Sequence, residues 1–184
     1  MTATSRYIGL LRGINVSGQR SVRMEDLRSL FEKLGYSDVS SYIQSGNIFF
    51  SASPKSDDTS MAQTIEKAIT TQFSFDVPVI IRSQEEMKHI LAENPLLKEK
   101  GIQSEYLHVT FLQDGPSRQK ISAISTLDFN PDKFVIAGRE AYLYCPGGYG
   151  RTKINNTFFE NRLKVKTTTR NWKTVIKLVE LSEL

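Results

Sequence analysis

Apolar residues recur with two different periods along this chain. The order in which these periods alternate restricts the fold more than any other feature of the sequence. A period of two predicts strands and a period of 3.6 predicts helices. The elements expected in the first part of the chain are strand 6–14, helix 24–34, strands 39–43 and 47–51 joined at Gln44–Gly46, a helix through 61–73 and strand 77–82. This βαββαβ order predicts a ferredoxin-like unit, an antiparallel sheet with both helices on one face.

The second half of the chain begins the same order again. Its expected elements are strand 105–113, a helix capped by Ser117, and a hairpin of strands 133–137 and 140–145 across Gly138–Arg139. After the hairpin the pattern departs, because 154–163 and 170–182 have helical spacing and no final strand is evident. Ser83 and Glu86 form a capping-box pattern for one further helix that links the halves.

We therefore expect an α+β protein made of two ferredoxin-like (βαββαβ-type) subdomains from an internal duplication, with extra C-terminal helices. The expected divisions are an N-terminal subdomain 1–82, a linking helix and loop 83–104, and a C-terminal subdomain 105–184. Alignment of the halves by eye places Tyr7–Ile8 on Tyr106–Leu107, which pairs Arg12 with Phe111.

The composition is that of an ordinary globular protein, with 39% hydrophobic and 24% charged residues. No window approaches the roughly 18 consecutive apolar residues of a membrane span, and the first residues lack the apolar stretch of a signal peptide. We expect a cytoplasmic protein without a membrane partner. The single cysteine, Cys145, lies in an apolar strand, has no nearby ligand for a metal, and is expected to be structural. The net charge of +4 is compatible with a phosphate-bearing partner.

Four strings in the sequence, LLRGINVSG, YIQSGNIFFS, GYGRTKINN and TTTRNWKTVIKL, resemble signatures of a bacterial family of uncharacterised proteins, the domain of unknown function 1697 family. The resemblance spans nearly the whole chain. It implies paired ferredoxin-like subdomains, in agreement with the pattern of elements. It implies no catalytic residue and no ligand-binding residue, so it leaves the function open.

Motifs of common enzymes and cofactor sites are missing from this sequence. There is no GxGxxG after a strand, no phosphate-loop ending, no H-E-x-x-H, no G-x-S-x-G and no Cys/His spacing for a metal. The two histidines, His89 on a charged helix and His108 inside a strand, do not suggest a general acid or a triad. We therefore assign no catalytic residue, no cofactor and no metal.

Arg12 and Asn15 are the first candidates for a ligand site. Arg12 shares a strand face with apolar residues, and a guanidinium on such a face must be paired, since an unpaired buried charge costs several kcal/mol. Its partner is either a carboxylate or helix-end carbonyls of the fold, or an anionic ligand at the strand end beside Gly13 and Asn15.

A second group of cations lies near the start of the two C-terminal helices. Arg151 and Lys153 follow three glycines just before one helix, where backbone N–H groups and two cations would suit an anion. Thr168 and Arg170 stand before the next helix, where one hydroxyl, that of Thr169, is enough for the cap. The alternative is that the glycines only turn the chain and the cations are solvated.

These residues support three hypotheses. The first is a non-catalytic binding module for a phosphorylated small molecule, a nucleotide or a nucleic acid, with an anion site made of Arg12, Asn15, Arg151, Lys153, Thr168 and Arg170. The second is an enzyme that positions a phosphorylated substrate by electrostatics alone. The third is a structural or partner-binding protein in which the same residues only hold the halves together. Ligand identity, oligomeric state and the choice between enzyme and binding protein stay open at this level.

Overall fold

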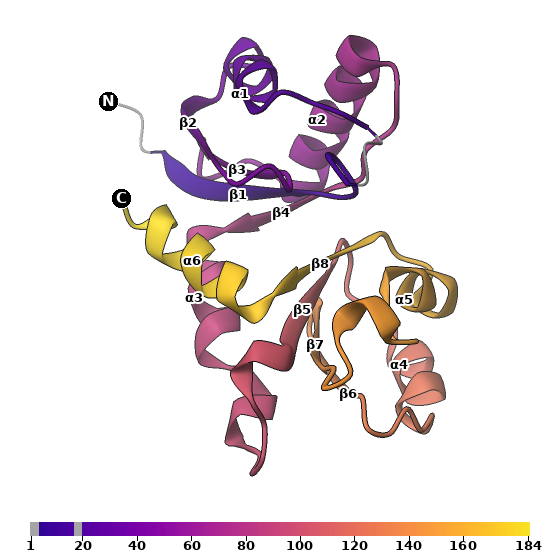
Figure 1. Cartoon of the computed structure of the whole chain (residues 1–184). Helices are drawn as coiled ribbons and strands as arrows, with labels where there is room; N and C mark the ends of the chain where they lie inside the picture. Colours follow the sequence, from indigo (N-terminus) through magenta and orange to yellow (C-terminus); the bar gives the residue numbers. More distant parts are fainter. Residues whose placement is uncertain (1–3, 17–19) are drawn as a thin grey trace. The chain divides into compact units, whose positions relative to one another are not determined.

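The computed structural model describes residues 4–16 and 20–184, and it contains two four-stranded antiparallel sheets in an α+β fold (Figure 1). The first seven elements are β1 (Ser5–Leu11), α1 (Met24–Lys33), β2 (Ser37–Tyr42), β3 (Asn47–Ala52), α2 (Asp58–Phe73), β4 (Val79–Ser83) and α3 (Gln84–Ala92). After two short 3-10 helices, the last main elements are β5 (Leu107–Leu112), α4 (Arg118–Ser125), β6 (Lys133–Ala137), β7 (Glu140–Tyr144), α5 (Asn156–Leu163), β8 (Thr167–Asn171) and α6 (Trp172–Ser182).

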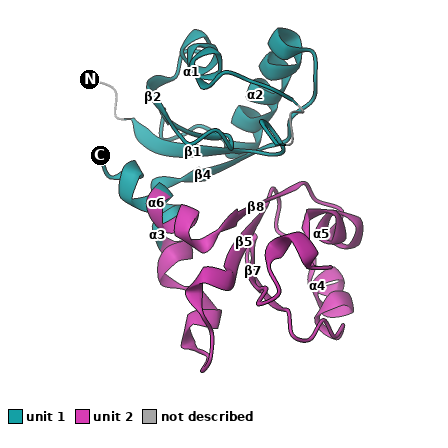
Figure 2. Ribbon diagram, viewed as in Figure 1, with its two compact units in different colours: residues 1–88, 178–184 teal, residues 89–177 magenta. Residues whose placement is uncertain are grey.

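The chain divides into two compact units (Figure 2). Unit 1 consists of residues 1–88 and 178–184, and unit 2 consists of residues 89–177. The strand order is β2-β3-β1-β4 in the first sheet and β6-β7-β5-β8 in the second, so each strand of one sheet has a counterpart in the other. The two units therefore share one order of elements and one order of strands.

Unit 1 is closed by the end of the chain. The side chain of Gln84 donates a hydrogen bond of 2.7 Å to the carbonyl of Ser182, and Lys88 lies 3.5 Å from a carboxylate oxygen of Glu183. Both contacts join α3 to the C-terminal end of α6 and the residue that follows it. Residues far apart in the sequence thus complete this unit.

Each unit has a hydrophobic core between its sheet and two helices. In unit 1, strand residues such as Ile48 and Ile81 pack against Phe31 of α1 and Ile65 of α2. In unit 2, Leu112 and Leu143 pack with Ile124 of α4 and Phe159 of α5, and Cys145 is buried there as a free thiol. The helices start where side chains cap them, as at Asp57 for α2 and Asn155 for α5.

Both predicted hairpins are confirmed. Tyr42 pairs with Asn47 and Ala137 pairs with Glu140, so the turns fall where the glycines predicted them. The predicted capping box is also present, because the Ser83 hydroxyl accepts from the Glu86 N–H while the Glu86 carboxylate accepts from Ser83.

The prediction for the end of the chain was wrong. The stretch Thr167–Asn171 is not the start of a helix but the strand β8, which pairs with β5, and α6 begins at Trp172. The cap of α6 is Asn171, whose side chain accepts from Thr174, and not Thr169. Of the two helices taken as extra, α5 is the counterpart of α2, and α6 follows β8 as α3 follows β4.

The first strand and the alignment of the halves also need correction. β1 ends at Leu11 rather than at residue 14, because Gly13 and Asn15 have φ values of 69° and 55°, which a strand does not allow. Leu11 donates to the Gly46 carbonyl and Leu112 to the Arg139 carbonyl, both at 2.8 Å. Hydrogen bonding therefore makes Leu11 and Leu112 equivalent.

The same register identifies the true counterpart of Arg12. The Arg12 N–H donates to Pro78 at 3.0 Å, and the Gln113 N–H donates to Lys166 at 2.9 Å. Arg12 is thus equivalent to Gln113, two residues beyond Phe111, and it lies just past the strand and not on a core-facing stripe.

Candidate functional site

Arg12 and Asn15 lie in the loop after β1, in unit 1. The Asn15 side chain is fully used within the fold, since it donates to the carbonyls of Val22 and Gln44, each at 2.9 Å, and accepts from the Val22 N–H at 2.8 Å. These bonds tie the loop to the first hairpin turn. Arg12 is partly buried and interacts with other parts of the chain. The geometry therefore gives Asn15 a structural task.

Thr168 and Arg170 are buried in β8 of unit 2. The Arg170 guanidinium donates to the Thr168 hydroxyl at 2.8 Å and to the Thr169 carbonyl at 2.9 Å. Burial lowers the pKa of Arg170 to about 10, so it keeps its charge at neutral pH. Arg82 has the same place in unit 1, because it faces Ile8 across the β1–β4 pair as Arg170 faces Val109. A buried arginine on the last strand is thus a feature of both sheets.

Arg151 and Lys153 do come together, in a pocket of about 280 Å³ in unit 2. Both are exposed, and within the described residues neither side chain has a hydrogen bond or an ion pair. Neither Thr168 nor Arg170 lines this pocket, whose lining is Asp128, Phe129, Asn130, Pro131, Asp132, Arg151 and Lys153. Two of the six predicted anion-site residues therefore form one site.

The loop that carries these two cations is anchored by the residue between them. Thr152 is buried, and its hydroxyl donates to an Asp132 oxygen at 2.6 Å while accepting from the Ile154 N–H at 3.2 Å. One carboxylate of the pocket is thus engaged by Thr152, which leaves Arg151 and Lys153 directed to solvent. Asp128 and Asp132 could not be recognised from the sequence as neighbours of the cations, because they lie some twenty residues before them.

A longer groove adjoins this pocket. It has a volume of about 440 Å³ and is lined by residues of α4, of β6 and of the segment between them: Ile121, Ser125, Leu127, Asp128, Phe129, Asp132, Lys133, Phe134, Val135 and Ile136. Asp128, Phe129 and Asp132 line both cavities, so the two are adjacent. The combined site has an apolar channel at one end and two cations at the other. Sequence reasoning missed this groove.

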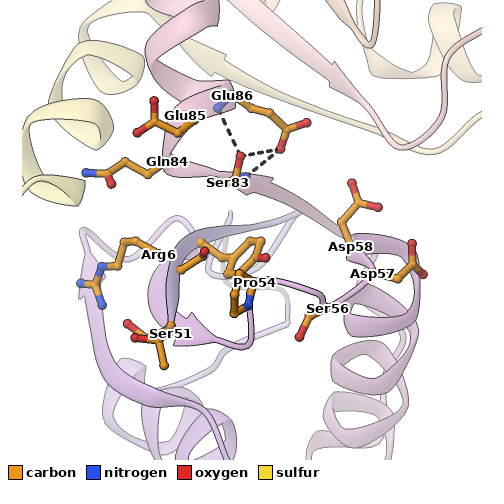
Figure 3. A pocket seen from close by; sticks show the side chains of 13 residues that line it. Arg6, Ser51, Pro54, Ser56, Asp57, Asp58, Ser83, Gln84, Glu85 and Glu86 are labelled. Carbon is orange, nitrogen blue, oxygen red and sulfur yellow. Dashed lines mark hydrogen bonds between the residues drawn. The ribbon is translucent and has the colours of Figure 1, made fainter. Parts of the chain in front are cut away.

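Unit 1 has a larger cavity of about 720 Å³, and its lining carries more acidic than basic side chains (Figure 3). Four carboxylates line it at the starts of α2 and α3, namely those of Asp57, Asp58, Glu85 and Glu86. Hydrogen bonds from the side chain and the N–H of Ser60 lower the pKa of Asp57, which caps α2, and Glu86 belongs to the capping box of α3. Asp58 and Glu85 lie in the first turns of these helices, where the helix dipole favours acidic residues.

Two further groups with nucleophilic or acid–base potential lie in unit 2. Burial raises the pKa of Cys145 to about 11, so the group is a thiol at neutral pH. The His108 ring stacks on Tyr149 at 4.9 Å, its Nδ1 contacts the Tyr106 carbonyl at 3.2 Å, and burial lowers its pKa. Neither residue lines the pocket of Arg151 and Lys153.

Two searches of the described residues concern metals and membranes. No group of three or more His, Cys, Asp and Glu residues there is placed to hold a metal ion. Within the same residues no helix combines the length and the apolar character needed to cross a bilayer.

Comparison with known proteins places this chain in a family. Residues 4–142 match the family described as "Protein of unknown function (DUF1697)". The chain belongs to this family. The match includes LLRGINVSG and YIQSGNIFFS, while the strings GYGRTKINN and TTTRNWKTVIKL lie beyond it.

A solved structure extends the likeness to the whole chain. The conserved bacterial protein SP0830 from Streptococcus pneumoniae has 25% sequence identity and a TM-score of 0.76, with 98% of this chain and 99% of that one covered. No curated protein matches the chain. The family membership thus comes without an assigned activity.

Proposed function

We propose that this member of the family is a cytoplasmic, non-catalytic binding protein for a phosphorylated ligand, whose phosphate is held by Arg151 and Lys153. The supporting observation is that both side chains line one pocket without a protein partner, although carboxylates line it as well. The planar guanidinium suits two oxygens of a phosphate, and the ammonium adds a compact charge. A cavity of about 280 Å³ accommodates the anionic end of a ligand.

Titration with O-phosphoserine tests this proposal. We expect the compound to raise the melting temperature of the full chain, because a ligand that binds only the folded state stabilises it. Arg151→Ala and Lys153→Ala should each abolish the increase. Arg162→Ala, which removes an exposed arginine of α5 outside the pocket, is the matched control and should keep it. An increase that survives both pocket variants would disprove the proposal.

A nucleic acid is a second source of phosphate, and salt separates it from a small ligand. Affinity for short RNA that falls steeply with salt concentration, by many-fold between low and physiological ionic strength, would indicate contacts with several phosphates. Affinity that depends weakly on salt would indicate a single phosphate group, as the small pocket favours.

We also propose that the two units are ferredoxin-like and arose by internal duplication. In support, both have the order βαββαβ followed by a helix, the same strand order, and equivalent hydrogen bonds at Leu11 and Leu112. Alignment of many family members tests this. If sequence profiles of the two halves align at the register that pairs Arg82 with Arg170, duplication is supported, and any other register would contradict it.

A further inference from the structure

We infer that the ligand is an extended peptide that adds to β6 as a fifth, antiparallel strand, with an anionic residue at its C-terminal end beside Arg151 and Lys153. This inference rests on the proposed function for the anionic end alone. Its main support is the structure of the β6 edge and of the groove next to it.

The edge of β6 offers unused backbone groups. β6 is the outermost strand of its sheet and pairs only with β7. The hairpin between them has a two-residue turn in which Gly138 has a φ of 61°, as the first position of a type II′ turn requires. In such a hairpin Ala137 and Val135 bond to β7, so the N–H and C=O groups of Phe134 and Ile136 point outward. A peptide strand can pair with these groups.

The groove provides room for side chains of that peptide. In unit 1 the helix α1 packs along the edge strand β2, whereas α4 in unit 2 does not pack closely on β6. The space between α4 and β6 is the groove of about 440 Å³. Leu127 and Val135 on its walls are 39% and 36% exposed, so apolar surface there is accessible to a partner.

The position of the cations fixes the direction of the peptide. The residues shared by groove and pocket, Asp128, Phe129 and Asp132, precede β6 and lie at its Lys133 end. An antiparallel partner strand ends at that point. Its last residue therefore reaches the pocket of Arg151 and Lys153. There the Asp132 carboxylate already accepts from Thr152 and the two cations have no partner among the described residues, which favours an anionic residue.

The equivalent edge strand in unit 1, β2, has features that prevent pairing with a further strand. β2 has a register shift between Ser37 and Ser40, and Asp38 has a φ of 51°. The Arg6 side chain donates to the Asp38 carbonyl and to the Ser40 hydroxyl. Bulges and charged residues are the usual means by which proteins prevent edge pairing. Apart from Lys133 at its start, β6 consists of apolar residues in a regular register, which favours a binding role for its edge.

Three pools of synthetic peptides test the inference. Each peptide has about six residues, the length that spans β6, with threonine alternating with valine, isoleucine, leucine or phenylalanine. The pools end in phosphoserine amide, glutamate amide or serine amide, and free O-phosphoserine is the fourth probe. Binding to the full chain is measured by NMR titration, and the exchange of the Phe134 and Ile136 amide protons is measured alongside.

We expect the phosphoserine pool to bind at least about tenfold more tightly than O-phosphoserine, and to slow exchange at Phe134 and Ile136. Leu127→Lys should weaken peptide binding at least about tenfold and leave O-phosphoserine binding unchanged. Leu97→Lys, which changes a 47% exposed leucine outside the groove in the same unit, should affect neither. Arg151→Ala should weaken both ligands.

The outcomes separate the inference from the proposed function. If O-phosphoserine binds and no pool binds better, or if exchange at Phe134 and Ile136 is unchanged, the peptide inference is overturned and the phosphate site stands. If the glutamate pool binds as well as the phosphoserine pool, the peptide inference is supported and the phosphate proposal fails. If the serine pool also binds as well, the anionic end of the peptide is overturned together with the phosphate proposal. If those amides are protected without peptide in a concentration-dependent dimer, the occupant is a second copy of the chain and the inference is overturned.

Discussion

Unit 1 and unit 2 have the same sheet order, but their charged residues serve different ends. In unit 1 two acids of the large cavity, Asp57 and Glu86, cap helices, and Arg6 contacts a backbone carbonyl of the edge strand β2. In unit 2 Arg151 and Lys153 have no such task within the described chain, and the edge strand β6 borders an open groove. The last strands of the two sheets are alike, since each carries a buried arginine, Arg82 or Arg170. The edge strands β2 and β6 differ. This difference is the basis on which we propose unit 2 as the binding unit.

Substitution of the turn glycines should show the largest difference in stability loss between the two units. A Cβ on Gly46 would lie 2.7 Å from the Leu11 Cβ, and its φ is 76°, whereas a Cβ on Gly138 has 3.8 Å to its nearest neighbour at a φ of 61°. We expect Gly46→Ala to lower the free energy of unfolding by about 4 kcal/mol and Gly138→Ala by about 1 kcal/mol. Urea denaturation measures both, and equal losses would contradict the packing difference.

Substitutions of the two buried arginines should instead cost equal amounts of stability. Arg82→Ala and Arg170→Ala each remove a buried guanidinium with backbone or hydroxyl partners, and each should cost about 3 kcal/mol of stability. The exposed Arg162→Ala should change stability by less than about 0.5 kcal/mol. A large loss in only one of the two buried variants would break the equivalence of the sheets.

Removing Arg6 should make the edge strand β2 more accessible to solvent. Arg6→Ala deletes the hydrogen bond to Asp38 and the contact over the Phe49 ring, where the guanidinium lies 5.6 Å from the centroid. We expect a loss of about 1 kcal/mol and faster amide exchange in β2. Arg23→Ala removes an exposed ion pair at the start of α1 and should leave β2 exchange unchanged. Unchanged exchange in Arg6→Ala would mean that Arg6 does not protect the edge.

The smallest expected effect is on the pH dependence of stability, and it concerns one pair of equivalent residues. Tyr7 in unit 1 corresponds to His108 in unit 2, since they face Ser83 and Asn171. Burial lowers the pKa of His108, so the unfolded chain binds the proton more readily than the folded one. Stability should therefore be full above the unfolded pKa of about 6.5 and fall as the pH drops below it. His108→Gln should reduce that fall, as measured by urea midpoints at neutral and mildly acidic pH. An unchanged slope would contradict the assignment.

Much of the fold follows from local signals in the sequence. The hairpins were predicted because Gly46 and Gly138 adopt positive φ at turns, and the capping box at Ser83 marked the start of α3. β8 was missed because its Thr, Arg and Asn residues resemble a helix start, while the apolar surroundings that bury them come from distant strands. A single sequence does not show such surroundings.

Part of the candidate site could be predicted from the sequence. Arg151 and Lys153 stood out as cations after glycines, and the structure places them in one pocket. Asn15 could not be recognised as structural, because its partners Val22 and Gln44 are brought to it by the loop and the hairpin. The groove depends on how far α4 lies from β6, a distance that no residue pattern encodes.

The contacts of Gln84 with Ser182 and of Lys88 with Glu183 have a consequence for biosynthesis. The ribosome makes residues 1–88 long before residues 178–184, yet both segments belong to unit 1. That unit is therefore incomplete until all of unit 2 has been translated. Premature termination shortly before residue 178 would damage the first-made unit rather than the last.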